Sequence, residues 1–169
     1  MLKAMLLSLT LLTGASAASA QTFPSRPMRI VVPFPPGGGT DIGTRILAQK
    51  LQEAWGQPVV VENKPGAAGI VGTDLTAKST PDGHTIMMGN IGTHAINVSL
   101  YKQLSYDPVK DFAPVSMVAD LPLLLLVHPS VPAKTVPEFL AHAKANADAV
   151  KMASTGNGSS PHEIGRAHV

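Results

Sequence analysis

The sequence contains no cysteine and few charged residues. Without cysteine it can form neither a disulfide framework nor a thiolate metal site, which excludes small disulfide-stabilised secreted toxins and growth factors. Charged residues make up 14% of the chain, against about a quarter in a typical soluble domain. They form no basic block interleaved with aromatic residues, which argues against nucleic acid as a partner. No apolar run reaches the roughly 20 residues that a transmembrane helix needs.

The first 20 residues have the order of a secretory signal peptide. Lys3 supplies the positive charge, residues 4–12 form a short apolar core, and residues 18–20 (Ala-Ser-Ala) fit a cleavage site before Gln21. Removing Lys3 leaves 12 Lys and Arg against 11 Asp and Glu, so the mature net charge is +1. An exported chain without cysteine suits a bacterial periplasm, and we expect the protein there.

Beyond residue 21, buried strands alternate with amphipathic helices. The pattern predicts strands at 28–32, 59–61 and 84–88 and helices at 40–55, 70–78 and 94–100. The residues expected to face the core are Ile42, Ile46, Leu47, Leu51 and Ala54 in one helix, and Val71 and Leu75 in the next. This βαβαβα order predicts an α/β fold with an open parallel sheet. Ligands bind such sheets at the carboxyl ends of the strands, where the loops at Gly37, Gly66 and Gly89 lie.

From Tyr106 the pattern changes. Apolar runs predict strands at 115–119 and 123–127, and a short strand at 150–153. Thr135 and Glu138 have the spacing of a capping box, opening a helix expected to bury Val136, Phe139, Leu140 and Ala143. Residues 150–161 then repeat the order of strand, glycine loop and helix start, with Ser160 as the cap and Pro161 at the first helical position. We therefore predict one domain over 21–119 and the start of a second over 120–162.

The loop after the first strand contains three consecutive glycines, Gly37 to Gly39, followed at once by a helix. This arrangement leaves main-chain N–H groups unpaired and favours binding of an anionic group. It is not a phosphate-binding P-loop, because Thr44-Arg45 replaces the required Lys-Ser/Thr, and the dinucleotide fingerprint fails at Ile42. Asp41 would also repel phosphate. The residue could cap its helix, orient a water or meet a ligand amine, and a tight turn without ligand is a further reading of the loop.

Catalytic motifs are incomplete. Residues 158–162 place a serine after Gly158 but end in His162, where a nucleophile elbow needs glycine. The six histidines show no metal-binding spacing, although His94 and His162 lie near the predicted loops. We expect a binding protein that is not an enzyme and carries no cofactor or metal. An exported serine hydrolase using Ser159 or Ser160 with a histidine is the alternative, and an envelope protein without ligand is a third hypothesis.

Four motifs, in this order, resemble the Bug/TctC family, the periplasmic substrate-binding components of tripartite tricarboxylate transporters. They occupy residues 33–41, 62–69, 106–112 and 154–159. The resemblance implies a periplasmic-binding-protein-like, two-domain α/β fold that captures a small carboxylate in the interdomain cleft. It also implies water-bridged ligand contacts, delivery to the membrane subunits of the transporter, and a monomer when full length.

In such proteins the two glycine loops act as pincers that hold a carboxylate through main-chain N–H groups and hydroxyls. With Asn90 after the third strand, the candidate ligand-binding residues are Phe34, Pro35, Gly38, Gly39, Thr40, Asp41, Asn90, Thr155, Gly156, Asn157, Gly158, Ser159 and Ser160. Family members continue beyond this length, and residues 163–169 match the translation of a sequencing-adapter DNA. We therefore expect the N-terminal part of the fold, followed by a non-native tail.

Overall fold

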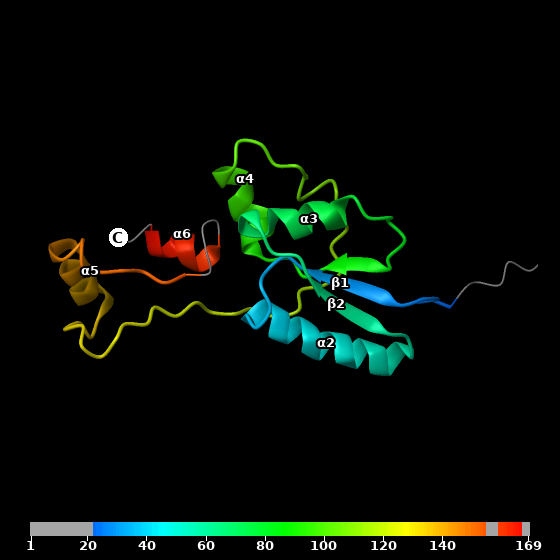
Figure 1. The fold of residues 1–169 in the computed structure, drawn as a ribbon, viewed down its shortest axis with the longest axis horizontal. Helices are drawn as coiled ribbons and strands as arrows, with labels where there is room; N and C mark the ends of the chain where they lie inside the picture. Colours follow the sequence, from blue (N-terminus) through cyan, green and yellow to red (C-terminus); the bar gives the residue numbers. More distant parts are fainter. Residues whose placement is uncertain (1–21, 155–158, 167–169) are drawn as a thin grey trace, which may run out of the picture.

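The computed structural model describes residues 22–154 and 159–166 and has an α/β architecture (Figure 1). Its sheet has three parallel strands in the order β2-β1-β3, with Ile30 in register with Val61 on one side and Ile86 on the other. The strands are β1 (Met28–Val32), β2 (Val59–Asn63) and β3 (Thr85–Met87). β1 lies at the centre and is almost fully buried, which explains its continuous apolar sequence. The predicted parallel sheet is confirmed.

Helices cover both faces of the sheet, with α2 below and α3 above it in the view of Figure 1. The helical elements of this region are α2 (Gly39–Trp55), η2 (Ala67–Gly69), α3 (Ile70–Ala77), η3 (Gly92–Ile96) and α4 (Asn97–Leu100). At the end where the strands begin, the Phe23 ring packs edge-on against His84 at 5.0 Å and Trp55 at 6.4 Å between centroids. The glycine loops lie at the opposite end, where the strands finish.

The expected buried face of α2 is found only in part, since Leu47 and Leu51 are half-buried and Ala54 is exposed. Ile42 and Ile46 are 53% and 61% exposed, and the buried side chains are Asp41, Thr44 and Ala48. Thr44 is accommodated because its hydroxyl donates to the carbonyl of Thr40 at 2.6 Å. Small and satisfied polar residues bring the helix close to the sheet, which periodicity of large apolar residues alone does not predict. The same holds in α3, where Val71 is 49% exposed and Gly72 and Thr73 are buried.

The predicted strands at 115–119, 123–127 and 150–153 are not formed. In the described part of the chain, residues 113–127 make no main-chain hydrogen bond to another segment. Their side chains are exposed, with Leu124 at 78% and Leu126 at 83%. A strand requires a hydrogen-bonded neighbour, and an apolar run by itself does not supply one.

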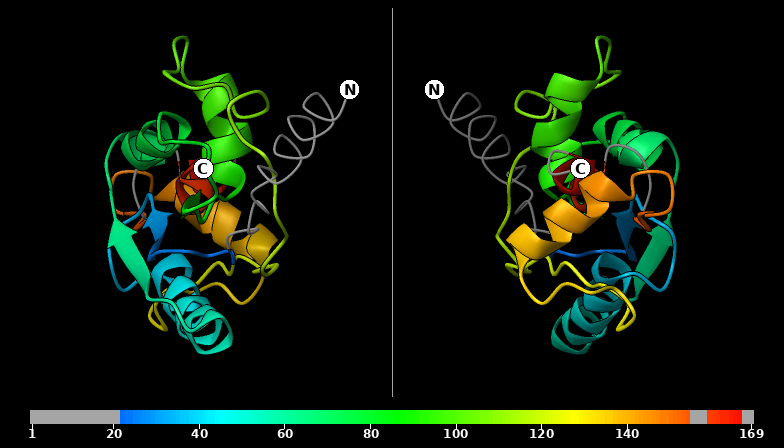
Figure 2. Two further views of the ribbon diagram at one scale, coloured as in Figure 1. Left: turned by 90° about the vertical axis from the view of Figure 1, so that its right-hand side faces the viewer. Right: turned by 90° about the vertical axis from the view of Figure 1, so that its left-hand side faces the viewer.

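The extended segment leads to α5 (Val136–Ala145) and α6 (Ser160–Arg166), on the side toward which the strands point (Figures 1 and 2). The capping box of α5 is confirmed, since Glu138 N–H donates to Thr135 Oγ1 at 3.4 Å and Thr135 N–H donates to the Glu138 carboxylate at 3.1 Å. Ala143 is buried as predicted, whereas Val136 is 53% exposed.

At α6 the main-chain carbonyl of Ser159 accepts the first helical bond, from Glu163 N–H, so the cap lies one residue before the predicted Ser160. None of the helices described is both long enough and apolar enough to cross a bilayer. The division into two domains near residue 119 stays a prediction.

Candidate functional site

The loop from Phe34 to the start of α2 presents unpaired main-chain donors. Gly38 is the residue before the helix, in an extended conformation with φ −78° and ψ 165°. Because glycine has no side chain, this position provides no side-chain cap for the helix. The first helical bond runs from Ile42 N–H to the carbonyl of Gly38. Within the described residues, no acceptor meets the N–H groups of Gly39, Thr40 and Asp41. These three donors, at the positive end of a 17-residue helix, form a site suited to an anion.

The carboxylate of Asp41 points back into the protein and closes the loop. Its side chain is 3% exposed. It accepts hydrogen bonds from Gly37 N–H at 2.8 Å and Asn63 Nδ2 at 2.9 Å, and it pairs with Arg45 at 3.0 and 3.1 Å. Because Arg45, Gly37 N–H and Asn63 all donate to the ionised form and outweigh the opposing effect of burial, the pKa of Asp41 falls to about 2. Both carboxylate oxygens are therefore occupied by the protein itself.

Asn63 and Arg45 complete this arrangement, which we call the Asp41 clasp (Gly37, Asp41, Arg45 and Asn63). Asn63 Nδ2 also donates to the carbonyl of Phe34 at 3.1 Å, and Arg45 donates to Asn63 Oδ1 at 2.8 Å. Gly37 adopts φ +87°, a conformation open to glycine. Sequence reasoning did not select Asn63 or Arg45 as site residues. The four-residue spacing of Asp41 and Arg45 on one helix was the available signal.

The turn after β2 packs directly against this loop. Four consecutive residues, Gly66 to Gly69, have positive φ angles, including Ala67 at 44° and Ala68 at 55°. A left-handed conformation costs an alanine about 1–2 kcal/mol, so the surrounding contacts must impose it. A Cβ built on Gly69 would lie 3.4 Å from the Phe34 ring and 2.8 Å from Thr93. This close approach brings the loops that follow all three strands together.

Buried polar side chains support the turn at residues 66–69 through hydrogen bonds. Asn97 is fully buried, and its Nδ2 donates to the carbonyl of Ala68 at 3.1 Å and to the Tyr106 hydroxyl at 3.3 Å. Tyr106 in turn donates to the carbonyl of Thr93 at 2.6 Å. Asn90 is a predicted ligand residue. Its main-chain N–H donates to Thr93 Oγ1 at 3.1 Å, and its Oδ1 accepts from Thr93 N–H at 3.2 Å. These side chains support the loops, a role the sequence did not reveal.

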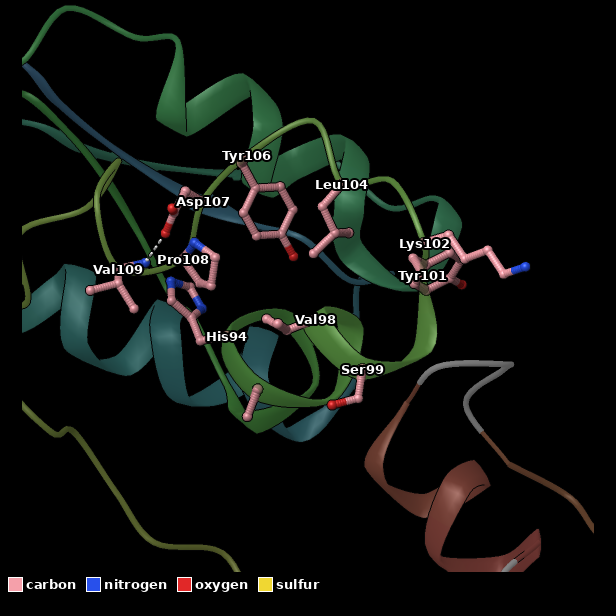
Figure 3. A pocket seen from close by; sticks show the side chains of 11 residues that line it. His94, Val98, Ser99, Tyr101, Lys102, Leu104, Tyr106, Asp107, Pro108 and Val109 are labelled. Carbon is pink, nitrogen blue, oxygen red and sulfur yellow. Dashed lines mark hydrogen bonds between the residues drawn. The ribbon is translucent and has the colours of Figure 1, made fainter.

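An open hollow of about 570 Å³ lies between η3 and α4 on one side and the segment 101–109 on the other (Figure 3). Its lining is mostly apolar and includes His94, Val98, Tyr106, Pro108 and Val109. His94 contacts the Thr93 hydroxyl at 2.8 Å and stacks edge-on against Phe112, and its burial lowers the pKa of the ring, which leaves it neutral at pH 7. None of the predicted ligand residues lines this hollow, whose charged lining residues are Lys102 and Asp107.

The second predicted glycine loop is only partly described. Thr155, Gly156, Asn157 and Gly158 lie outside the described residues, whereas Ser159 is buried and Ser160 is half-buried. In the described chain His162 Nδ1 pairs with Ser154 Oγ at 2.8 Å. The hydrolase alternative, which uses Ser159 or Ser160 with a histidine, stays a prediction. Over the same residues, no group of three or more His, Asp and Glu side chains is placed to hold a metal ion.

Comparison with known proteins is consistent across sequence and structure. Residues 44–166 match the family described as the tripartite tricarboxylate transporter family receptor, TctC. BugT of Bordetella pertussis is 43% identical over 149 residues, which cover 88% of this chain and 46% of BugT.

Two solved structures agree with this match. MatC of Rhodopseudomonas palustris, solved with bound malate, is 38% identical with a TM-score of 0.76, over 82% of this chain and 47% of MatC. The periplasmic binding protein BugD is 35% identical with a TM-score of 0.71, over 85% and 48% of the two chains. The chain thus spans about half the length of these relatives. By sequence and by fold, it belongs to the TctC/Bug family of tripartite tricarboxylate transporter receptors.

Proposed function

We propose that this chain belongs to an extracytoplasmic receptor that captures a small carboxylate and delivers it to the membrane subunits of a tripartite tricarboxylate transporter. The observation that carries the proposal is the set of three unpaired N–H donors of Gly39, Thr40 and Asp41 at the start of α2. Hydrogen bonds from such donors to a carboxylate are charge-assisted and strong without an arginine clamp. The malate in the related MatC structure supports the ligand class.

The remaining parts of the site follow the same chemistry. Residues 155–160 would approach the ligand from the opposite side, with hydroxyls and bridging waters completing the contacts. The exported receptor would act in the periplasm as a monomer, closing by a hinge movement. It would have no catalytic residue, no cofactor and no nucleic-acid partner. Because main-chain donors recognise only the carboxylate, the rest of the ligand is specified elsewhere.

Asp41 contributes to this site through its main-chain N–H, not through its carboxylate. Both carboxylate oxygens are held inside the clasp. Neither a direct bond from a ligand amine nor an oriented water is needed to explain its presence. The same reasoning gives Phe34 a structural part, since its carbonyl accepts from Asn63 and its ring covers Gly69.

A matched pair of substitutions at Gly39 tests the proposal. Proline is tolerated at the first helical position and removes the N–H, and the extended Gly38 before it is compatible with a following proline. Gly39→Ala keeps the N–H, and its Cβ makes only an ordinary contact of 4.0 Å with Leu121. We expect Gly39→Pro to weaken malate binding about tenfold or more, and Gly39→Ala to leave it nearly unchanged.

The measurement is a titration with malate and with its uncharged diamide. The titrated protein is ¹⁵N-labelled residues 21–169 carrying Leu124→Lys and Leu126→Lys, two exposed positions at which lysine is expected to keep the chain soluble. Saturable amide shifts at residues 38–41 with malate, and none with the diamide, are expected. Equal shifts with both compounds, or equal affinities of the two Gly39 variants, would contradict the proposal.

A further inference from the structure

A negative charge stands directly behind the proposed anion site. Asp41 is the third residue of α2, and its own main-chain N–H is one of the three donors. A carboxylate in the first helical turn stabilises the helix, but it also opposes an incoming anion. The site can work only if the charge of Asp41 is compensated where a ligand would sit.

Arg45 provides this compensation from the next turn of the same helix. Its Nε and one terminal nitrogen meet the two oxygens of Asp41 at 3.1 and 3.0 Å, a two-point contact that fixes the guanidinium. The terminal nitrogen also donates to Asn63 Oδ1 at 2.8 Å, which anchors Arg45 to the end of β2. The side chain of Arg45 is half exposed while that of Asp41 is 3% exposed. The guanidinium of Arg45 is therefore held within the clasp and does not extend toward the main-chain N–H groups of residues 39–41.

We propose that Arg45 is a positioning residue of the anion site that acts through Asp41. It cancels the carboxylate charge and, together with Asn63, keeps that carboxylate turned away from the ligand. This inference rests on the proposed function, and it predicts that the contribution of Arg45 depends on the charge of the ligand. A ligand with two negative charges would depend on Arg45 more strongly than one with a single charge.

Malate and 3-hydroxybutyrate form a matched pair of ligands, since a methyl group in the second replaces one carboxylate of the first. For Arg45→Met we expect the affinity for malate to fall about tenfold and that for 3-hydroxybutyrate about threefold, with both losses shrinking as salt is raised. Arg45→Lys keeps the charge but loses the two-point contact, and it should stay within about threefold of the unsubstituted chain. Asp41→Asn combined with Arg45→Met removes both charges and should restore most of the affinity.

Lys50→Met is the control, because it makes the same change of net charge further along α2, where Lys50 pairs with Glu53. It should alter neither affinity by more than about twofold. Circular dichroism of each variant checks that helix content is kept. Equal losses for both ligands, no rescue by Asp41→Asn, or an Arg45→Lys variant that binds malate as weakly as Arg45→Met would overturn the inference while leaving the proposed function intact. Failure of the soluble Leu124→Lys, Leu126→Lys parent to bind either ligand would overturn both.

Discussion

Gly72 faces the main-chain carbonyl of Lys64 so closely that a Cβ at position 72 would lie 2.8 Å from the oxygen and 2.9 Å from Cα of Pro33. Both neighbours are backbone atoms at the carboxyl ends of β1 and β2, so neither can rotate away. The absence of a side chain at Gly72 is what allows α3 to approach the sheet at the point where the loops meet.

Gly72→Ala should therefore lower the free energy of unfolding by about 1–3 kcal/mol. Gly43→Ala is the matched control, because Gly43 lies inside α2 with nothing within 4 Å of its added Cβ. That substitution should raise stability by about 0.5–1 kcal/mol. Urea unfolding followed by circular dichroism measures both, and a Gly72→Ala variant as stable as Gly43→Ala would show that α3 can shift without cost.

The exposed leucines of 121–127 should make the chain prone to association. Leu124 and Leu126 are 78% and 83% exposed in a segment without strand partners, and such apolar extended segments pair between molecules. We expect residues 21–169 to aggregate or to show no cooperative thermal transition. Leu124→Lys with Leu126→Lys should raise the soluble fraction several-fold in size-exclusion chromatography.

A conservative control for that prediction is Leu124→Ile with Leu126→Ile, which keeps apolar character and should not improve solubility. A monodisperse, cooperatively unfolding chain without any substitution would refute the expectation. If the lysine variant behaves as predicted, it becomes the parent for the unfolding measurements proposed for the other positions.

Ala67 adopts φ +44° with its side chain exposed, so Ala67→Gly removes backbone strain without removing a buried contact. We expect a gain of about 1 kcal/mol in the free energy of unfolding. Ala54→Gly, at an exposed helical position of α2, should instead lose about 1 kcal/mol. The same chemical change thus has opposite signs at the two sites, and two losses of similar size would argue against the left-handed turn.

The Asp41 clasp makes a defined contribution to acid stability. The pKa of Asp41 is lowered from 3.8 to about 2, so the unfolded chain binds a proton more readily than the folded chain between these values. The stabilisation is complete above about pH 4 and is lost as the pH falls toward 2. We expect the stability difference between the unsubstituted chain and Asp41→Asn to be constant from pH 5 to 7 and to shrink between pH 4 and 2. A difference that stays constant down to pH 2 would show that folding does not lower the pKa of Asp41.

Sequence patterns predicted the features that depend on neighbouring residues. The apolar run of β1, the glycine loop that opens α2 and the capping box at Thr135 are all encoded within a few positions, and each is found. The clasp was not predicted, because Asn63 lies 22 positions after Asp41 in the sequence and belongs to β2, whereas Asp41 belongs to α2. Nothing in an alanine indicates positive φ, so the left-handed turn at Ala67 and Ala68 was also missed.

The errors share a physical origin in contacts made elsewhere in the chain. Whether residues 115–119 and 123–127 form strands depends on partners that their own sequence does not specify. The buried face of α2 was misjudged because a small residue, Ala48, and a satisfied Thr44 allow closer packing than Ile42 and Ile46 would.

The aromatic contacts of Phe23 have a practical consequence for how the protein can be attached to a surface. Phe23 is held against His84 and Trp55, and Trp55 is the last residue of α2, the helix that begins at Gly39. A linker joined ahead of Phe23 would therefore leave the molecule on the side away from the helix donors. An immobilised sensor built this way would direct the start of α2, where the proposed anion site lies, toward the solution, whether the linker holds it to a chip or to a lipid layer.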